Sequence, residues 1–187
     1  KTGTAVAQKL VDARVAAVVG HLNSGPTVPA SKIYASAGIP QISPAATTPV
    51  YTSQGYKTAF RVVANDKLIG RTLARHALGT LKARRIAVID DRTAFGQGLA
   101  DQFAREVRSG GGAAIVSRQF THDKATDFSA ILTQIRAQRP DLIFYGGMDA
   151  VAGPMLKQMK TLGVQARFVA GDGCLLYTSD AADDMQC

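Results

Sequence analysis

The sequence has no tryptophan, two cysteines and no long apolar run. No stretch reaches the ~20 apolar residues that a membrane-spanning helix needs, so none is expected. Residues 1–173 contain no cysteine, which excludes a disulfide framework and thiol chemistry from this part of the chain. Aromatic residues make up 6% of the chain, too few for platforms that stack single-stranded nucleic acid. An apolar content of 46% argues against a disordered chain.

Signatures of catalysis and of cofactor binding are also missing. The histidines are far apart without metal-ligand spacing, and no serine lies in a nucleophile-elbow context. Gly96-x-Gly98 is half of a dinucleotide fingerprint, but Asp101 stands where the third glycine belongs. The pair Asp90-Asp91 is similar to the acids of phosphate-receiver domains, but the lysine and hydroxyl that receivers need are absent from later strand ends. We therefore expect no enzyme, no cofactor and no metal site.

The end of the chain differs in character from the rest. The segment Cys174–Asp184 resembles the translated read-through of a common transposase sequencing adapter. We therefore interpret residues 174–187 as a non-native tail and leave them out of the fold prediction, the alternative being a natural acidic tail. Without its three aspartates, 11 acids remain against 22 bases, a formal charge of +11. The bases are dispersed, which favours a solvated basic surface over a nucleic-acid site.

Strand-like and helix-like segments alternate along the chain, which predicts an α/β fold of parallel sheets flanked by crossover helices. Because the run after Val63 has its own first helix and at least four strands, we place a crossing between two lobes within residues 61–65. The predicted domains are therefore 1–62 and 63–173. The predicted helices are 4–13, 26–37, 68–82, 97–108, 127–137 and 149–162, and the predicted strands are 15–20, 39–42, 58–63, 85–90, 113–120, 141–145 and 166–170.

Ligands of open α/β sheets bind beyond the carboxyl ends of the strands. In the first lobe this rule selects loops 21–26 and 43–48. Ser24 stands at a helix N-terminus, where free N–H groups attract a carboxylate or phosphate, or it simply caps that helix. In the second loop, small residues allow close approach of a ligand and Thr47 offers a hydroxyl; the alternative is an ordinary turn with two prolines.

In the second lobe the same rule selects loops 91–96, 146–150 and 171–173. Phe95 either anchors its loop or forms one wall of a pocket, and Met148 can line an apolar pocket. Asp149 is most simply a helix cap. Asp172 lies between two glycines and is suited to accept hydrogen bonds from an ammonium group, or it is only a turn residue.

Taken together, the loops resemble one family, the periplasmic leucine/isoleucine/valine-binding proteins, which are the solute receptors of branched-chain amino-acid ABC transporters. The resemblance covers essentially all of residues 1–173. Each motif alone is weak, but seven occur in the family's order. They are Val18–Gly25 (VVGHLNSG), Gly38–Pro49 (GIPQISPAATTP), Phe60–Val62 (FRV), Phe95–Gly98 (FGQG), Asp127–Ser129 (DFS), Asp141–Gly147 (DLIFYGG) and Gly171–Gly173 (GDG).

The resemblance implies a type I periplasmic binding protein with two Rossmann-like lobes and an amino acid held in the cleft between them. In the first lobe it implies that Ser24 binds the ligand carboxylate. It also implies that the Ala45 carbonyl takes the ammonium, with Ala46 beside it, and that Thr47 contacts both groups. In the second lobe it implies that Asp172 pairs with the ammonium.

Two further positions depart from the family pattern. Phe95 and Met148 stand where close relatives place tyrosines. The loss of two hydroxyls implies a more apolar or differently shaped cleft than that of a leucine receptor.

The resemblance also implies that the chain is incomplete at both ends, without its signal peptide, its opening strand and helix, and everything after Gly173. We expect a monomeric periplasmic receptor that passes its solute to a membrane permease. Two alternatives remain. A lac-repressor-type transcription regulator shares the fold but needs a helix-turn-helix upstream, and an enzyme needs a catalytic group in one of the five loops.

Reading the genomic locus across both ends of the chain tests these expectations. We expect a signal peptide and an opening strand upstream, and a second α/β half in place of Cys174–Cys187. A helix-turn-helix upstream would support the regulator instead. A stop codon directly after Cys187 would show that the tail is natural.

Overall fold

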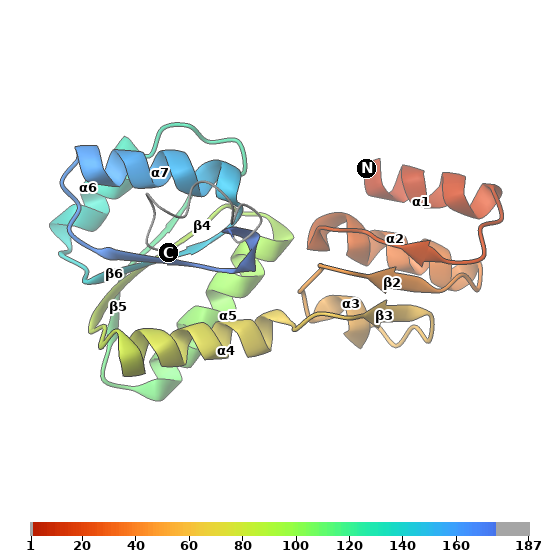
Figure 1. Ribbon diagram of the computed structural model, residues 1–187, viewed down its shortest axis with the longest axis horizontal. Helices are drawn as coiled ribbons and strands as arrows, with labels where there is room; N and C mark the ends of the chain where they lie inside the picture. The colour runs from red at the N-terminus through yellow and green to blue at the C-terminus, as the bar shows by residue number, and fades with distance from the viewer. Residues whose placement is uncertain (1, 175–187) are drawn as a thin grey trace. The chain divides into compact units, whose positions relative to one another are not determined.

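The computed structural model describes residues 2–174, so the predicted tail lies outside the described residues except for Cys174. The chain divides into two compact units after Asp66, whereas the predicted lobe boundary follows residue 62. Each unit is a parallel sheet with helices packed on it (Figure 1). Within the described residues, no helix combines the length and apolar character that crossing a bilayer requires.

The first unit contains a three-stranded parallel sheet with the order β1-β2-β3. Its core is small and joins the helices to the first strand through Ala7, Val18, Ala30, Tyr34 and Ile39. The elements are α1 (Thr2–Asp12), β1 (Val18–Val19), α2 (Ser24–Ser36), β2 (Gln41–Ser43), α3 (Val50–Ser53) and β3 (Ala59–Arg61).

The second unit contains a four-stranded parallel sheet with the order β5-β4-β6-β7. The predicted strand 85–90 is found with the same bounds. The elements are α4 (Asp66–Arg75), a π-helical turn (His76–Thr80), β4 (Arg85–Asp90), α5 (Ala94–Gly110), β5 (Ala114–Phe120), α6 (Ser129–Ala137), β6 (Leu142–Gly146), α7 (Asp149–Thr161), β7 (Arg167–Ala170) and a 3₁₀ turn (Asp172–Cys174).

Three predictions of local structure were wrong in the first hundred residues. The predicted strand 15–20 is reduced to two residues, because Val15 donates its N–H to Leu10 at the end of α1 and does not join the sheet. The segment between the predicted strands 39–42 and 58–63, for which no helix was predicted, contains the short helix α3, and Pro49 before it is already in helical conformation. The predicted helix 68–82 is α-helical only to Arg75 and continues as the π-helical turn.

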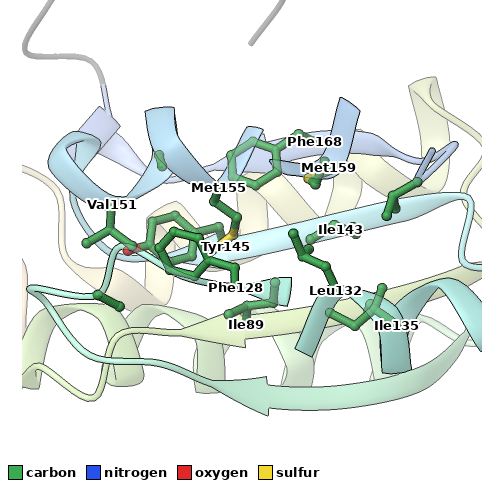
Figure 2. Close-up of a cluster of buried hydrophobic side chains, with 14 residues drawn as sticks. Ile89, Phe128, Leu132, Ile135, Ile143, Tyr145, Val151, Met155, Met159 and Phe168 are labelled. Atoms are coloured by element: carbon green, nitrogen blue, oxygen red, sulfur yellow. The ribbon is translucent and has the colours of Figure 1, made fainter. Parts of the chain in front are cut away.

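The second unit has two cores, one on each face of its sheet. Successive residues of a strand point to opposite faces, so Val88 and Phe144 pack under α4 and α5, whereas Ile89 and Tyr145 pack under α6 and α7. Both central strands are therefore apolar at nearly every position, as expected of a parallel strand covered on two sides. Figure 2 shows the cluster beneath α6 and α7, with Met155 and Met159 of α7 and Leu132 and Ile135 of α6.

On the other face, the rings of Phe103 and Phe144 stack with their centroids 3.9 Å apart and their planes 7° apart. Both side chains are fully buried. Truncation of Phe144 would leave a cavity between α5 and β6, so we expect Phe144→Ala to lower the free energy of unfolding by about 3–5 kcal/mol in urea titrations followed by circular dichroism.

Phe120→Ala is the matched control, because the Phe120 side chain is 58% exposed and mainly stacks with the guanidinium of Arg92. This variant should lose under about 1 kcal/mol. Equal losses in the two variants would contradict the assignment of Phe144 to the core.

Candidate functional site

Hydrogen bonds join the loops that follow β1 and β2 in the first unit. The Ser43 hydroxyl donates to the carbonyl of His21 at 2.8 Å and accepts the N–H of Ala46 at 3.0 Å. The Thr27 hydroxyl donates to the same His21 carbonyl at 3.2 Å. Ser43 therefore fixes both loops at the carboxyl edge of the sheet, although the sequence analysis did not single it out.

Ser24 does not cap the helix that it opens. The N-cap position belongs to Asn23, which makes no side-chain capping bond, and Ser24 is the first residue of α2. The Ser24 side chain is buried, and its Oγ accepts the N–H of Thr48 in the second loop at 3.3 Å. The capping alternative is therefore wrong, and α2 begins before Pro26, which occupies its third position.

The second loop holds the other three predicted site residues of this unit. Ala45 is half-buried and Ala46 is buried. Thr47 is also buried, and its Oγ1 has no hydrogen-bond partner within the described residues. The Thr47 backbone is held in place, because its carbonyl accepts the N–H of Asp66 at 2.9 Å. A buried hydroxyl without a partner is costly and rare in folded proteins, and it is the kind of group that a ligand satisfies.

In the second unit, the strand register brings three predicted loops to one edge. Asp90 lies opposite Gly146, and Tyr145 lies opposite Ala170, so β4, β6 and β7 end side by side. A Cβ atom on Gly173 would lie 2.8 Å from both Met148 Sδ and Phe95 Cε1. The structure thus brings Phe95 and Met148 together around Gly173, the residue that follows Asp172 in the chain.

Asp172 opens the 3₁₀ turn after β7, so its backbone is indeed that of a turn residue. Oδ1 of its carboxylate is buried without a hydrogen-bond partner in the described residues. Burial raises the pKa of this carboxyl above its ordinary value, and a hydrogen bond from its own backbone N–H partly opposes the shift. An ammonium group placed beside Oδ1 would satisfy both its charge and its hydrogen-bonding capacity.

The prediction that Asp149 caps a helix was wrong by one position. Met148 occupies the N-cap of α7 in extended conformation, and Asp149 is the first helical residue. Its charge still favours the helix, because the N-terminal turn carries partial positive charge.

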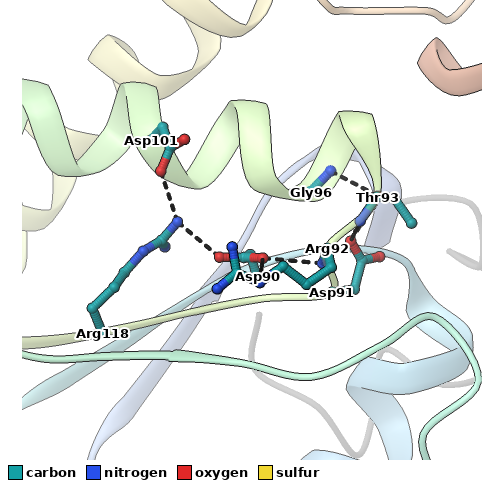
Figure 3. A network of polar contacts seen from close by, with 7 residues as sticks. All are labelled: Asp90, Asp91, Arg92, Thr93, Gly96, Asp101 and Arg118. Carbon is teal, nitrogen blue, oxygen red and sulfur yellow. Dashed lines mark hydrogen bonds and ion pairs between the residues drawn. The ribbon is translucent and has the colours of Figure 1, made fainter.

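A polar network that the sequence analysis did not identify holds the loop after β4 (Figure 3). Asp91 Oδ1 accepts the N–H of Thr93 at 3.0 Å and its hydroxyl at 2.6 Å. Thr93 Oγ1 in turn accepts the N–H of Gly96 at 2.9 Å, so Thr93 caps α5. The order Asp-x-Thr directly before a helix was the available signal. Burial raises the pKa of the Asp91 carboxyl.

The neighbouring carboxylate, Asp90, is held by two arginines (Figure 3). Arg118 forms an ion pair with Asp90 Oδ2 at 2.8 Å and donates a hydrogen bond to Asp101 Oδ1 at 2.8 Å, and thereby joins β4, β5 and α5. Arg92 lies on the other side, with its Nε 3.7 Å from Asp90 Oδ1. Asp90, at the end of β4, and Asp91, directly after it, thus hold neighbouring elements together. The described residues contain no group of three histidine, cysteine or acidic side chains able to hold a metal.

The glycines of these loops serve packing. A Cβ atom on Gly96 would collide with Asp91 Oδ1 and with the carbonyl of Gly146, so α5 approaches β6 through a contact that only glycine permits. Gly147 is equally crowded, because its Cβ would meet the Tyr145 hydroxyl and lie 2.8 Å from Asp91 Oδ2. Gly96 is thus a position of close helix–strand packing.

Comparison with known proteins identifies relatives over nearly the whole chain. A family model described as periplasmic binding protein matches residues 1–183. An amino acid binding protein from Pseudomonas aeruginosa is 38% identical over 174 residues, which is 92% of this chain and 46% of that protein. A leucine-specific-binding protein from Salmonella typhimurium is 38% identical over 176 residues, which is 92% of this chain and 47% of that protein. The chain thus spans about half the length of the curated relatives it matches.

Solved structures give the same result. A leucine-binding protein from Thermotoga maritima matches 91% of this chain and 49% of its own with a TM-score of 0.86 and 28% identity. A branched-chain amino-acid transporter substrate-binding protein from Streptococcus pneumoniae, solved with isoleucine, matches 91% of this chain and 48% of its own, with a TM-score of 0.78 and 28% identity. These matches confirm the predicted fold class.

Gly147 offers a direct test of the packing at this edge. A methyl group there would press on Tyr145 and Asp91, so we expect Gly147→Ala to lower the free energy of unfolding by about 1–3 kcal/mol in urea titrations.

The control is Gly153→Ala in the middle of α7, where an added Cβ meets nothing within 4 Å. Helix propensity predicts a gain of up to about 1 kcal/mol for this variant. Destabilisation by Gly153→Ala, or none by Gly147→Ala, would contradict the close approach of the loops.

Proposed function

The chain belongs to the periplasmic binding protein family, and on that premise we propose that it is part of a solute receptor of an ABC transporter. The receptor captures a branched-chain amino acid or a related small solute in the periplasm and delivers it to a membrane permease. It acts as a monomer and carries out no chemical reaction. The names of the matched relatives support this proposal, because they are amino-acid-binding and leucine-binding proteins.

The observation that carries the proposal is that each unit, taken by itself, has an unsatisfied polar group in a loop at the carboxyl edge of its sheet. Thr47 in the first unit has a buried hydroxyl without a partner, and Asp172 in the second unit has a buried carboxylate oxygen without one, within the part of the chain that the structure describes. An amino acid in solution is a zwitterion, which needs donors for its carboxylate and acceptors for its ammonium. The two units offer one kind of group each, and no bond needs to be made or broken.

The roles of the remaining residues follow from their chemistry. The Ser24 hydroxyl accepts the N–H of Thr48 and still has its own proton to donate to a ligand carboxylate, and the Ala45 carbonyl can accept from the ammonium. Ala46 is small enough to let a ligand approach the backbone. Phe95 and Met148 offer apolar surface around Gly173, which follows Asp172 in the chain, and would contact the ligand side chain, with no hydroxyl to hydrogen-bond it.

The regulator of the lac-repressor type is not favoured. The relatives that match 92% of the chain are named as binding proteins. The hydroxyl and carboxylate set also fits a zwitterion.

Titration of the protein as its gene encodes it with the L-amino acids tests the proposal. We expect one or a few amino acids with apolar side chains to bind. Asp172→Asn should weaken that binding about 100-fold, because the neutral amide cannot pair with the ammonium charge. Asp12→Asn is the control, since Asp12 is an exposed carboxylate at the end of α1, and this change should leave the affinity unaltered. Absence of binding to every amino acid, or equal effects of the two variants, would contradict the proposal.

The pH dependence of binding gives an independent check on Asp172. Burial raises the pKa of this carboxyl in the ligand-free protein, and only the ionised form pairs with an ammonium. The affinity should therefore be constant at high pH and fall about tenfold per pH unit as the pH drops below that raised pKa. In Asp172→Asn the slope should disappear. If the affinity of the variant falls with pH by the same amount, the group whose protonation weakens binding is not Asp172.

A further inference from the structure

Basic side chains gather at the amino edge of the second unit's sheet, the edge opposite the candidate site. They lie just before or at the first residues of β4, β6 and β7, where a parallel sheet brings strand starts together. All are exposed. The set, here called the basic edge, is Lys82, Arg84, Arg85, Arg139 and Arg167.

The basic edge contains little opposing charge. Within residues 81–85, 138–141 and 163–167 the sequence has one acid, Asp141. The Asp141 carboxylate is already engaged, because it accepts the backbone N–H of Arg84 at 2.8 Å and that of Arg85 at 3.1 Å. It forms no ion pair with a side chain of the basic edge within the described residues.

Three of the guanidinium groups are held by neutral acceptors. Arg84 donates to the carbonyl of Gly112 at 3.2 Å, Arg85 to that of Gln138 at 2.6 Å, and Arg167 to that of Leu81 at 2.7 Å. These bonds orient the arginines without cancelling their charge. The ion pairs of this unit's described residues lie instead around Asp90 at the opposite edge.

Helix dipoles account for other basic residues of the second unit, but not for those of the basic edge. The last turns of α5, α6 and α7 carry Arg108, Arg136 and Lys160, which offset the partial negative charge of a helix C-terminus. The five residues of the basic edge lie outside α-helices, in the connections and strand starts. They are therefore a surplus beyond what the helices need.

The composition of this face also indicates its partner. Of the large apolar side chains that the described residues expose, none lies in the segments of the basic edge. Stable protein interfaces depend on buried aromatic or aliphatic anchors, which are missing here. A charged surface that has no exposed apolar side chains is better suited to bind another charged surface. A hollow of about 560 Å³, lined in part by Lys82 and Arg167, adds room for a polar group at this edge.

We propose that the basic edge holds the second unit against anionic phospholipid headgroups of a membrane surface. Attraction between basic side chains and such a surface adds up residue by residue and acts within about one Debye length, ~8–10 Å at ordinary salt. The proposal goes beyond solute capture: it concerns the face opposite the candidate site. Such binding would keep a receptor that serves a membrane permease close to the membrane.

Co-sedimentation of the protein with vesicles tests the proposal. One vesicle preparation contains phosphatidylcholine alone, and the other contains equal parts of phosphatidylcholine and phosphatidylglycerol. We expect binding to the anionic vesicles only, weakening as salt is raised. The triple variant Lys82→Gln, Arg84→Gln, Arg139→Gln should bind at least about 30-fold more weakly, because each base at the surface contributes separately. Within the described residues the side chains of Lys82 and Arg139 make no hydrogen bond, and that of Arg84 makes one, to the exposed carbonyl of Gly112, so the fold should survive, which circular dichroism checks.

The matched control removes three exposed lysines from the first unit with the same change in net charge: Lys9→Gln, Lys32→Gln and Lys57→Gln. It should bind anionic vesicles within about twofold of the unaltered protein. Equal weakening of the two triple variants would overturn the proposal, as would equal binding to neutral vesicles. If poly-L-glutamate displaces the protein from vesicles at a lower concentration than soluble phosphatidylglycerol does, the partner of the basic edge is an acidic protein and the proposal is wrong. Amino-acid titration of both variants should be unchanged, which separates this proposal from the receptor function.

Discussion

The parallel pairing of β4 with β5 and β6 is the constraint on which the second unit depends. Because β4 is central, its residues are buried on both faces, and their alternation decides which helices cover which side. Val88 and Phe144 require α4 and α5, whereas Ile89 and Tyr145 require α6 and α7. A slip of one residue would exchange the two faces and leave both cores mismatched.

The same parallel direction gives the unit two chemically different edges. Strand ends and helix N-termini meet at one edge, where Asp90, Asp91 and Asp172 lie. Strand starts and helix C-termini meet at the other, where the bases accumulate. Helix dipoles account for part of this distribution, since bases in the last turns of α5, α6 and α7 stabilise helix C-termini, whereas the basic edge lies outside the helices. The fold thus separates a face suited to a ligand ammonium from a face suited to anions.

Polar groups at the candidate site are of two kinds, those with hydrogen-bond partners and those without. Thr93 and Ser43 both donate and accept hydrogen bonds, and they hold loops in place. Thr47 Oγ1 and Asp172 Oδ1 are buried with no partner in the described residues, at a cost to stability. Other buried atoms, those of the Gln41 amide in β2 among them, also have no partner there, so Thr47 and Asp172 stand out by their place in loops at the carboxyl edge of a sheet.

The sequence alone was sufficient for the fold class, the strand Arg85–Asp90 and the loops at the carboxyl edge, because these follow from local periodicity and from the parallel direction that crossover helices impose. It could not show that Ser24 faces Thr48 instead of capping α2, since that bond joins residues 24 positions apart. Nor could it find the role of Gly96 against Gly146, or which carboxylates are already paired. Burial and partnership depend on segments that are distant in the chain, so only the tertiary structure could decide them.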